Sequence, residues 1–142
     1  MSAADNKRLL HHIFAELANG NAGPFVESMA DDFSWTITGT TNWSKTFVGK
    51  KAVIGELLAG LQAALNPPIR LIPNRILADE DHVVVEAYGI NTTKTGKPYN
   101  NRYCFVFRLA DGQLQELTEY LDTELVTTAF GDLARAAGDG RS

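Results

Sequence analysis

The amino-acid sequence predicts an α+β fold in which helices cover one face of a strongly bent, mainly antiparallel sheet. Helical spacing of apolar residues occurs within residues 5–65, and strand-like alternation fills residues 69–126. Short turn-forming sequences separate the strand-like runs, which favours antiparallel order between neighbours. The 142 residues fit a single domain, which we expect at residues 1–130, with a loose tail at residues 131–142.

Two helices and a strand are expected in the first part of the chain. Residues 5–20 predict an amphipathic helix, because their apolar side chains recur every three or four positions and Gly20 ends the pattern. A shorter helix is expected at residues 22–31, with Pro24 in its first turn. Residues 33–39 alternate apolar and polar side chains, which predicts a strand with one apolar face.

A third helix and four strands complete the expected order. Residues 40–49 should form a loop or a short hairpin. Apolar residues recur at helical spacing in residues 50–65, and the two prolines that follow end this helix. Four strand-like runs come next, at residues 69–78, 82–93, 98–110 and 113–126.

Charge and hydropathy limit the classes of partner. The net charge is -4 and the basic residues are scattered, so we expect no nucleic acid partner. No stretch resembles a signal peptide or a membrane span, which predicts a cytoplasmic protein without a membrane partner.

The cysteine and histidine content predicts neither a disulfide nor a metal site. Cys104 is the only cysteine, so it has no partner within the chain. His11 and His12 are neighbours that point in different directions on a helix, and His82 is expected in a turn. We therefore expect a protein that works without a metal or another cofactor.

Alternation in the strand-like runs separates two faces of each strand. The bulkier face of the third run should pack against the helices, and it carries Tyr99, Asn101, Tyr103, Phe105, Phe107 and Leu109. Periodicity does not decide which face of the second run points inward. One face carries Val84, Glu86, Tyr88 and Ile90, and the other carries Val83, Val85, Ala87 and Gly89. The face of Glu119 in the fourth run is open in the same way.

Several motifs resemble a known superfamily. A glycine and a helix follow a tryptophan-bearing strand, and the sequences TGKPYN, FRLADGQL and EYLDTE come later. Over roughly residues 5–130 the chain resembles the nuclear transport factor 2-like superfamily, including SnoaL-like polyketide cyclases, ketosteroid isomerase-related proteins and limonene-1,2-epoxide hydrolase. The resemblance implies a cone-shaped, cystatin-like fold, in which three N-terminal helices pack on a curved mixed sheet around a deep apolar pocket.

The resemblance also implies which residues face the pocket. Glu119 would take the inward position of an acidic residue that the epoxide hydrolase uses. Its neighbours at the pocket would be Tyr99, Asn101, Tyr103, Glu86 and Tyr88. We expect a homodimer through the outer face of the sheet, from the habit of the family and from Cys104 and Val106, which are flanked by arginines.

The catalytic sets of these relatives are incomplete in this chain. The hydrolase has an arginine and an aspartate two residues apart on the second strand of the meander, where this chain has Glu86 and Tyr88. The isomerase has a proton-transferring aspartate on the strand before the glycine, where the nearest match is Thr36. Neither activity therefore transfers intact.

The candidate site combines a carboxylate with hydrogen-bond donors. Loss of hydration in an apolar pocket would raise the pKa of Glu119 toward the range useful for proton transfer, and Glu86 is a candidate second carboxylate. Tyr103 and Asn101 are candidate catalytic donors to a substrate carbonyl as it becomes an enolate. The candidate substrate-binding residues are Trp35, Tyr88, Tyr99, Phe105 and Phe107.

Two classes of function follow from these residues. The first is a cofactor-free isomerase, cyclase, or hydratase or hydrolase that uses carboxylate acid–base chemistry on a small apolar carbonyl compound or epoxide. The second is a non-catalytic module of the same fold that binds a ligand or another protein. In that second case, Glu119 would only bond tyrosine hydroxyls across the sheet or face solvent.

Overall fold

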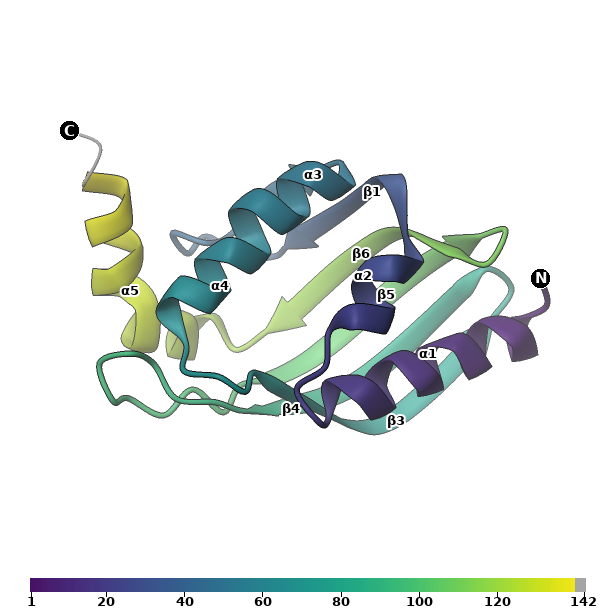
Figure 1. The fold of residues 1–142 in the computed structure, drawn as a ribbon, viewed down its shortest axis with the longest axis horizontal. Helices are drawn as coiled ribbons and strands as arrows, with labels where there is room; N and C mark the ends of the chain where they lie inside the picture. Colours follow the sequence, from purple (N-terminus) through teal and green to yellow (C-terminus); the bar gives the residue numbers. More distant parts are fainter. Residues whose placement is uncertain (140–142) are drawn as a thin grey trace.

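A computed structural model describes the backbone of residues 1–139 and the side chains of residues 1–131. Figure 1 shows helices over one face of a curved sheet and a further helix at one end of it, which confirms the α+β class. The helical elements are α1 (Ala3–Leu17), α2 (Gly23–Ser28), α3 (Lys50–Ala52), the π-helix η1 (Val53–Leu58), α4 (Ala59–Ala64) and α5 (Thr123–Asp139). The strands are β1 (Met29–Ile37), β2 (Thr46–Val48), β3 (Arg70–Asp79), β4 (His82–Ile90), β5 (Arg102–Ala110) and β6 (Gln113–Leu121).

The sheet is mixed and mainly antiparallel, as the sequence predicts. Its strand order is β2-β1-β6-β5-β4-β3, with β1 and β6 parallel and the other neighbours antiparallel. Since β2 and β3 form opposite edges, the helical stretch from α3 through η1 to α4 carries the chain back across the covered face (Figure 1). This crossing leaves β1 free to pair with the last strand of the chain.

The N-terminal helix combines a capping box with an apolar stripe. The Ser2 side chain accepts a hydrogen bond from the Asp5 amide, and the Asp5 carboxylate accepts one from the Ser2 amide. α1 packs against β3 and β4. Its buried Phe14 ring lies 5.7 Å from Phe105 and 6.1 Å from Phe107, measured between ring centroids. The helix therefore makes this face of β5 the core face.

The register between β4 and β5 corrects the expected face of two residues. Ala87 lies directly opposite Tyr103, and opposed residues share a face of the sheet. The alternate residues Glu86 and Tyr88 therefore lie on the outer face, where Glu86 forms an ion pair with Arg75 at 3.1 Å. The expectation that Glu86 and Tyr88 face the pocket is therefore wrong. Periodicity separates the two faces of β4, but only the pairing of β4 with β5 shows which of them is the inner face.

The ends of two helices also differ from the expectation. α2 is shorter than predicted, since β1 begins directly after it. α5 begins at Thr123, within a run predicted to be a strand, and its backbone remains helical through Asp139. The helix thus passes residue 131, where we expected the tail to begin. Asp122 explains its start, because the carboxylate accepts a hydrogen bond from the Leu125 amide at 3.2 Å.

An aromatic cluster fills the core between α1, α2 and β5. Phe107 is 1% exposed, and its ring centroid lies 6.1 Å from that of Phe14 and 6.4 Å from that of Phe25. The side chain that the sequence suggested for substrate contact is therefore part of the packed core.

We expect Phe107→Ala to lower the free energy of unfolding by about 3–5 kcal/mol, because it leaves a cavity among rings that pack closely. Urea unfolding followed by circular dichroism measures the change. Leu77→Ala is the control, since Leu77 is 53% exposed and its truncation should change stability by less than about 1 kcal/mol. Equal effects of the two substitutions would contradict this packing.

Candidate functional site

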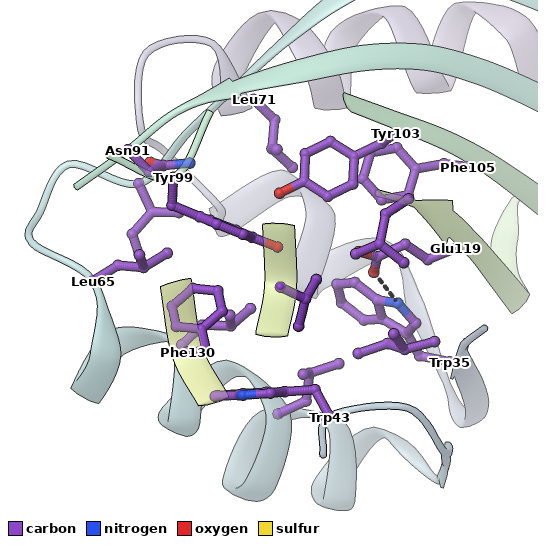
Figure 2. A pocket seen from close by; sticks show the side chains of 16 residues that line it. Trp35, Trp43, Leu65, Leu71, Asn91, Tyr99, Tyr103, Phe105, Glu119 and Phe130 are labelled. Atoms are coloured by element: carbon purple, nitrogen blue, oxygen red, sulfur yellow. Dashed lines mark hydrogen bonds between the residues drawn. The ribbon is translucent and has the colours of Figure 1, made fainter. Parts of the chain in front are cut away.

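A cavity of about 80 Å³ lies between the inner face of the sheet and the helices α4 and α5. Figure 2 shows the 16 side chains that line it, most of which are apolar or aromatic. The polar groups at its wall include the Glu119 carboxyl on β6 and the hydroxyls of Tyr99 and Tyr103. A few polar groups in an apolar cavity are typical of a small-molecule site.

Two neighbouring strands bring Glu119 to this cavity. Glu119 lies opposite Phe105 of β5 and beside Ile37 of β1, and only 6% of it is exposed. The indole Nε1 of Trp35 donates a hydrogen bond to Glu119 Oε1 at 2.8 Å, drawn as the dashed line in Figure 2. Among the described residues, no second hydrogen bond reaches the carboxyl group. Its other oxygen is therefore free to meet a ligand.

Burial gives this carboxyl group an unusual pKa. Loss of hydration disfavours the charged form and raises the pKa of Glu119 from 4.5 to about 7, although the Trp35 hydrogen bond lowers it in part. Both protonation states are consequently populated near neutral pH. A group with this balance can accept a proton and give it back.

The two tyrosine hydroxyls point toward the same space as Glu119 (Figure 2). Burial raises the pKa of Tyr99 to about 12 and that of Tyr103 well above the usual 10, and the neighbouring Tyr99 and Glu119 raise that of Tyr103 further. Both hydroxyls therefore stay protonated at neutral pH and remain donors. The Tyr103 ring stacks on Phe105 with centroids 4.9 Å apart, which fixes its direction.

Asn101 supports the site from behind the cavity wall. Its side-chain Nδ2 donates to the Tyr99 hydroxyl at 3.0 Å and to the Asp122 carbonyl at 3.1 Å. Its Oδ1 accepts hydrogen bonds from the backbone amides of Arg102 and Asp122. Since both donors of the amide are used, Asn101 positions Tyr99 and does not meet a substrate carbonyl, in contrast to the role expected from the sequence.

The other expected site residues divide between the cavity and the rest of the molecule. Four of them line the cavity with Glu119: Trp35, Tyr99, Tyr103 and Phe105. Phe107 lies in the aromatic core, and Glu86 and Tyr88 lie on the outer face of the sheet. None of these last three side chains lines the cavity.

Several lining residues were missed by the sequence analysis. Trp43 in the loop between β1 and β2 contributes to the wall, as do Val126 and Phe130 of α5. The spacing of four between Val126 and Phe130 is a helical signal that could have revealed this part of α5. Trp43 carries no comparable pattern, because its ring is placed by packing against Gly60 and Phe130, which are distant in sequence.

The described part of the chain contains no group of three or more His, Cys, Asp or Glu side chains arranged to hold a metal ion. Nor does any helix within the searched residues combine the length and hydropathy that crossing a bilayer requires.

The sequence matches a known family model over most of its length. The model of the SnoaL-like domain matches residues 10–117. No curated protein matches the chain in sequence.

Solved structures share the fold at low sequence identity. A proposed SnoaL-like polyketide cyclase from Jannaschia is 20% identical with a TM-score of 0.73, covering 89% of this chain and 92% of its own. A proposed isomerase from Bacillus subtilis is 19% identical with a TM-score of 0.73, covering 92% and 96%. An NTF2-like protein of unknown function from Burkholderia pseudomallei is 17% identical with a TM-score of 0.76, covering 91% and 98%. Identities this low support the fold and not an activity.

We expect Glu119→Gln to remove a pH dependence of stability. In the wild type, the folded state keeps the Glu119 proton up to about pH 7, whereas the unfolded chain releases it near pH 4.5. The contribution of Glu119 to the unfolding free energy therefore falls as pH rises from about 4.5 to about 7 and is constant above that. Relative to the wild type, the variant should gain about 3 kcal/mol between pH 4 and pH 8, measured by urea unfolding.

Trp35→Phe provides a second variant for the same measurement. It removes the hydrogen bond that lowers the pKa of Glu119, so the fall in stability should extend to higher pH than in the wild type. Parallel pH profiles for the wild type and Glu119→Gln would contradict the raised pKa.

Proposed function

Because this chain belongs to the SnoaL-like domain family, we propose that it is an enzyme that moves protons on small apolar carbonyl compounds without a cofactor. Glu119 is the acid–base group in this proposal. The observation that carries it is a carboxyl group with a pKa of about 7 at the wall of an apolar cavity. A strongly shifted pKa in a cavity is a recognised mark of a functional group.

The reaction begins with a ketone whose apolar body fills the cavity. The ionised Glu119 takes a proton from the carbon beside the carbonyl, and the electron pair of the broken C–H bond forms the enolate. The hydroxyls of Tyr99 and Tyr103 donate hydrogen bonds to the enolate oxygen, where the negative charge develops. The Trp35 hydrogen bond meanwhile holds the carboxyl group in one orientation.

Two outcomes follow from the enolate. If the protonated Glu119 returns its proton to a different carbon, the product is an isomer. If the enolate carbon attacks a second carbonyl, a carbon–carbon bond closes a ring and the proton goes to the resulting alkoxide. The proposed isomerase and polyketide cyclase among the structures of similar fold favour these two reactions over others.

We expect Glu119→Gln to slow enolisation by about a hundredfold or more, because the amide cannot accept the proton. The probe is cyclohexanone, a small ketone suited to the size of the cavity, in D2O, with hydrogen–deuterium exchange beside the carbonyl followed by NMR. The wild-type rate should rise with pH and level off above about pH 7, since the ionised carboxylate is the base. Glu86→Gln is the matched control, because the same change on the outer face should leave the rate within about twofold.

The same measurement separates the enzyme from the non-catalytic alternative. Binding of the ketone without accelerated exchange by the wild type would favour a ligand-binding module. Equal exchange rates for the wild type and Glu119→Gln would rule out Glu119 as the base.

We also propose that two copies pair through the outer face of the sheet. Tyr120 is 50% exposed and lies opposite Cys104, which is half-buried together with Val106 on the same face. The resemblance to the superfamily supports a dimer through this face. A single subunit would leave these apolar groups in water.

Light scattering at micromolar concentration is expected to give about twice the 15.5 kDa mass of the chain. Tyr120→Glu should reduce it to the mass of one chain, because it places a charge on the proposed interface. His12→Glu on the exposed side of α1 should leave the mass unchanged. A wild-type mass near 15.5 kDa would refute the dimer.

A further inference from the structure

One wall of the cavity beside Glu119 separates it from a second cavity of about 220 Å³. Among the described residues, Trp43 and Val126 are the two that line both spaces, so they form the partition between them. The rest of the second lining is mostly polar and consists of Thr40, Thr41, Asn42, Thr127 and Gly131. We call this space the threonine cavity, and the first space the Glu119 cavity.

The partition is a closely packed wall of side chains. The ring centroid of Trp43 lies 5.4 Å from that of Phe130 on α5. On α4, a Cβ added at Gly60 would come within 3.2 Å of the indole, so the missing side chain there gives the ring its space. Val126 is 3% exposed and belongs to the same buried cluster as Phe130. The two helices therefore hold the indole between them.

Hydrogen bonds within the loop fix the backbone that carries the indole. The Thr41 hydroxyl accepts a bond from the Trp43 amide at 3.1 Å. The Ser44 hydroxyl accepts one from the Thr41 amide at 3.0 Å and donates one to the Thr38 carbonyl at 2.9 Å. The fold thus sets the position of the wall before any ligand binds.

The Glu119 cavity is small for a ligand site, and Trp43 lies at its far end. It measures about 80 Å³, whereas pockets for drug-sized ligands usually measure about 300–1,000 Å³. Figure 2 shows Trp43 across the cavity from Tyr103, whose hydroxyl points toward the same space as Glu119. A ketone whose oxygen meets the tyrosine hydroxyls therefore extends toward Trp43. A substrate longer than a single ring would collide with the indole.

We infer that Trp43 determines substrate size: it closes the Glu119 cavity at its far end and restricts the substrates to ketones no larger than a single ring. The inference rests on the proposed function for the reaction itself, while the place of the indole between two cavities supplies the size limit. Gly60 is a positioning residue, because its missing side chain lets the indole occupy the wall. Removal of the indole would join the Glu119 cavity to the threonine cavity and make room for a longer ligand.

The test compares two ketones that differ in length. Cyclohexanone is a single ring, and 4-phenylcyclohexanone carries a second ring on the carbon farthest from the carbonyl. NMR titration at pH 7 gives the affinity of the complete protein for each. The wild type should bind cyclohexanone at least about tenfold more tightly. Because a second ring adds apolar surface that would otherwise strengthen binding, this order indicates a steric limit.

Trp43→Ala should shift the affinity ratio toward 4-phenylcyclohexanone by at least about tenfold, because the second ring can then enter the threonine cavity. Val126→Ala opens the same partition from α5 and should shift the ratio in the same direction by about threefold, which keeps the test valid if Trp43→Ala does not fold. Leu57→Ala is the matched control, since Leu57 is a buried lining residue of the Glu119 cavity alone. Its ratio should stay within about twofold of the wild type.

The outcomes distinguish this inference from the proposed function. Equal binding of the two ketones by the wild type, an unchanged ratio in both Trp43→Ala and Val126→Ala, or an equal shift in Leu57→Ala would overturn the size limit. Failure to bind either ketone would overturn the ligand class together with it. Absence of proton exchange in cyclohexanone, with the binding ratios as expected, would count against Glu119 as a base and would leave Trp43 supported as the residue that limits ligand size.

Discussion

The hydrogen bond from Trp35 Nε1 to Glu119 Oε1 is what allows an acidic group to sit in the wall of an apolar cavity. A buried charge without a partner costs several kcal/mol, whereas several strong donors would keep the carboxylate ionised at all ordinary pH values. A single neutral donor lies between these limits. It leaves the pKa of Glu119 at about 7, so the two protonation states are nearly balanced.

Backbone pairing determines that this bond forms at all. The parallel pairing of β1 with β6 brings Trp35 within reach of Glu119, and the antiparallel pairing of β5 with β6 places Phe105 opposite the same glutamate. Asn101 extends the arrangement, because its amide joins Tyr99 to the backbone at the end of β6. Glu119 and Tyr103 are therefore positioned by one continuous piece of sheet, and Asn101 fixes Tyr99 just before β5 begins.

The element order as far as β6, the mixed sheet and the inward position of Glu119 could be predicted from the sequence, because alternation and helical spacing are local signals and the resemblance supplied the face. The helix α5 was not predicted, since its first residues continue the strand-like run of β6. The outward position of Glu86 could not, since it depends on which residue of β4 lies opposite Tyr103. Trp43 was missed for a related reason: its place at the cavity depends on packing against Gly60 and Phe130, which are distant in sequence. The supporting role of Asn101 could not be predicted either, because it depends on hydrogen bonds to the backbone of Asp122, a residue 21 positions later.

The parallel β1–β6 pair joins Trp35 to a residue 84 positions later in the chain. During synthesis on the ribosome, β1 and the helices that follow it emerge well before the strand that completes the site. Until β6 has been made, part of the apolar lining of the cavity therefore stays exposed to solvent. Exposed apolar surface of this kind favours association between incompletely folded chains. The topology that assembles the acid–base pair thus also sets the interval in which a newly made chain is most exposed to aggregation.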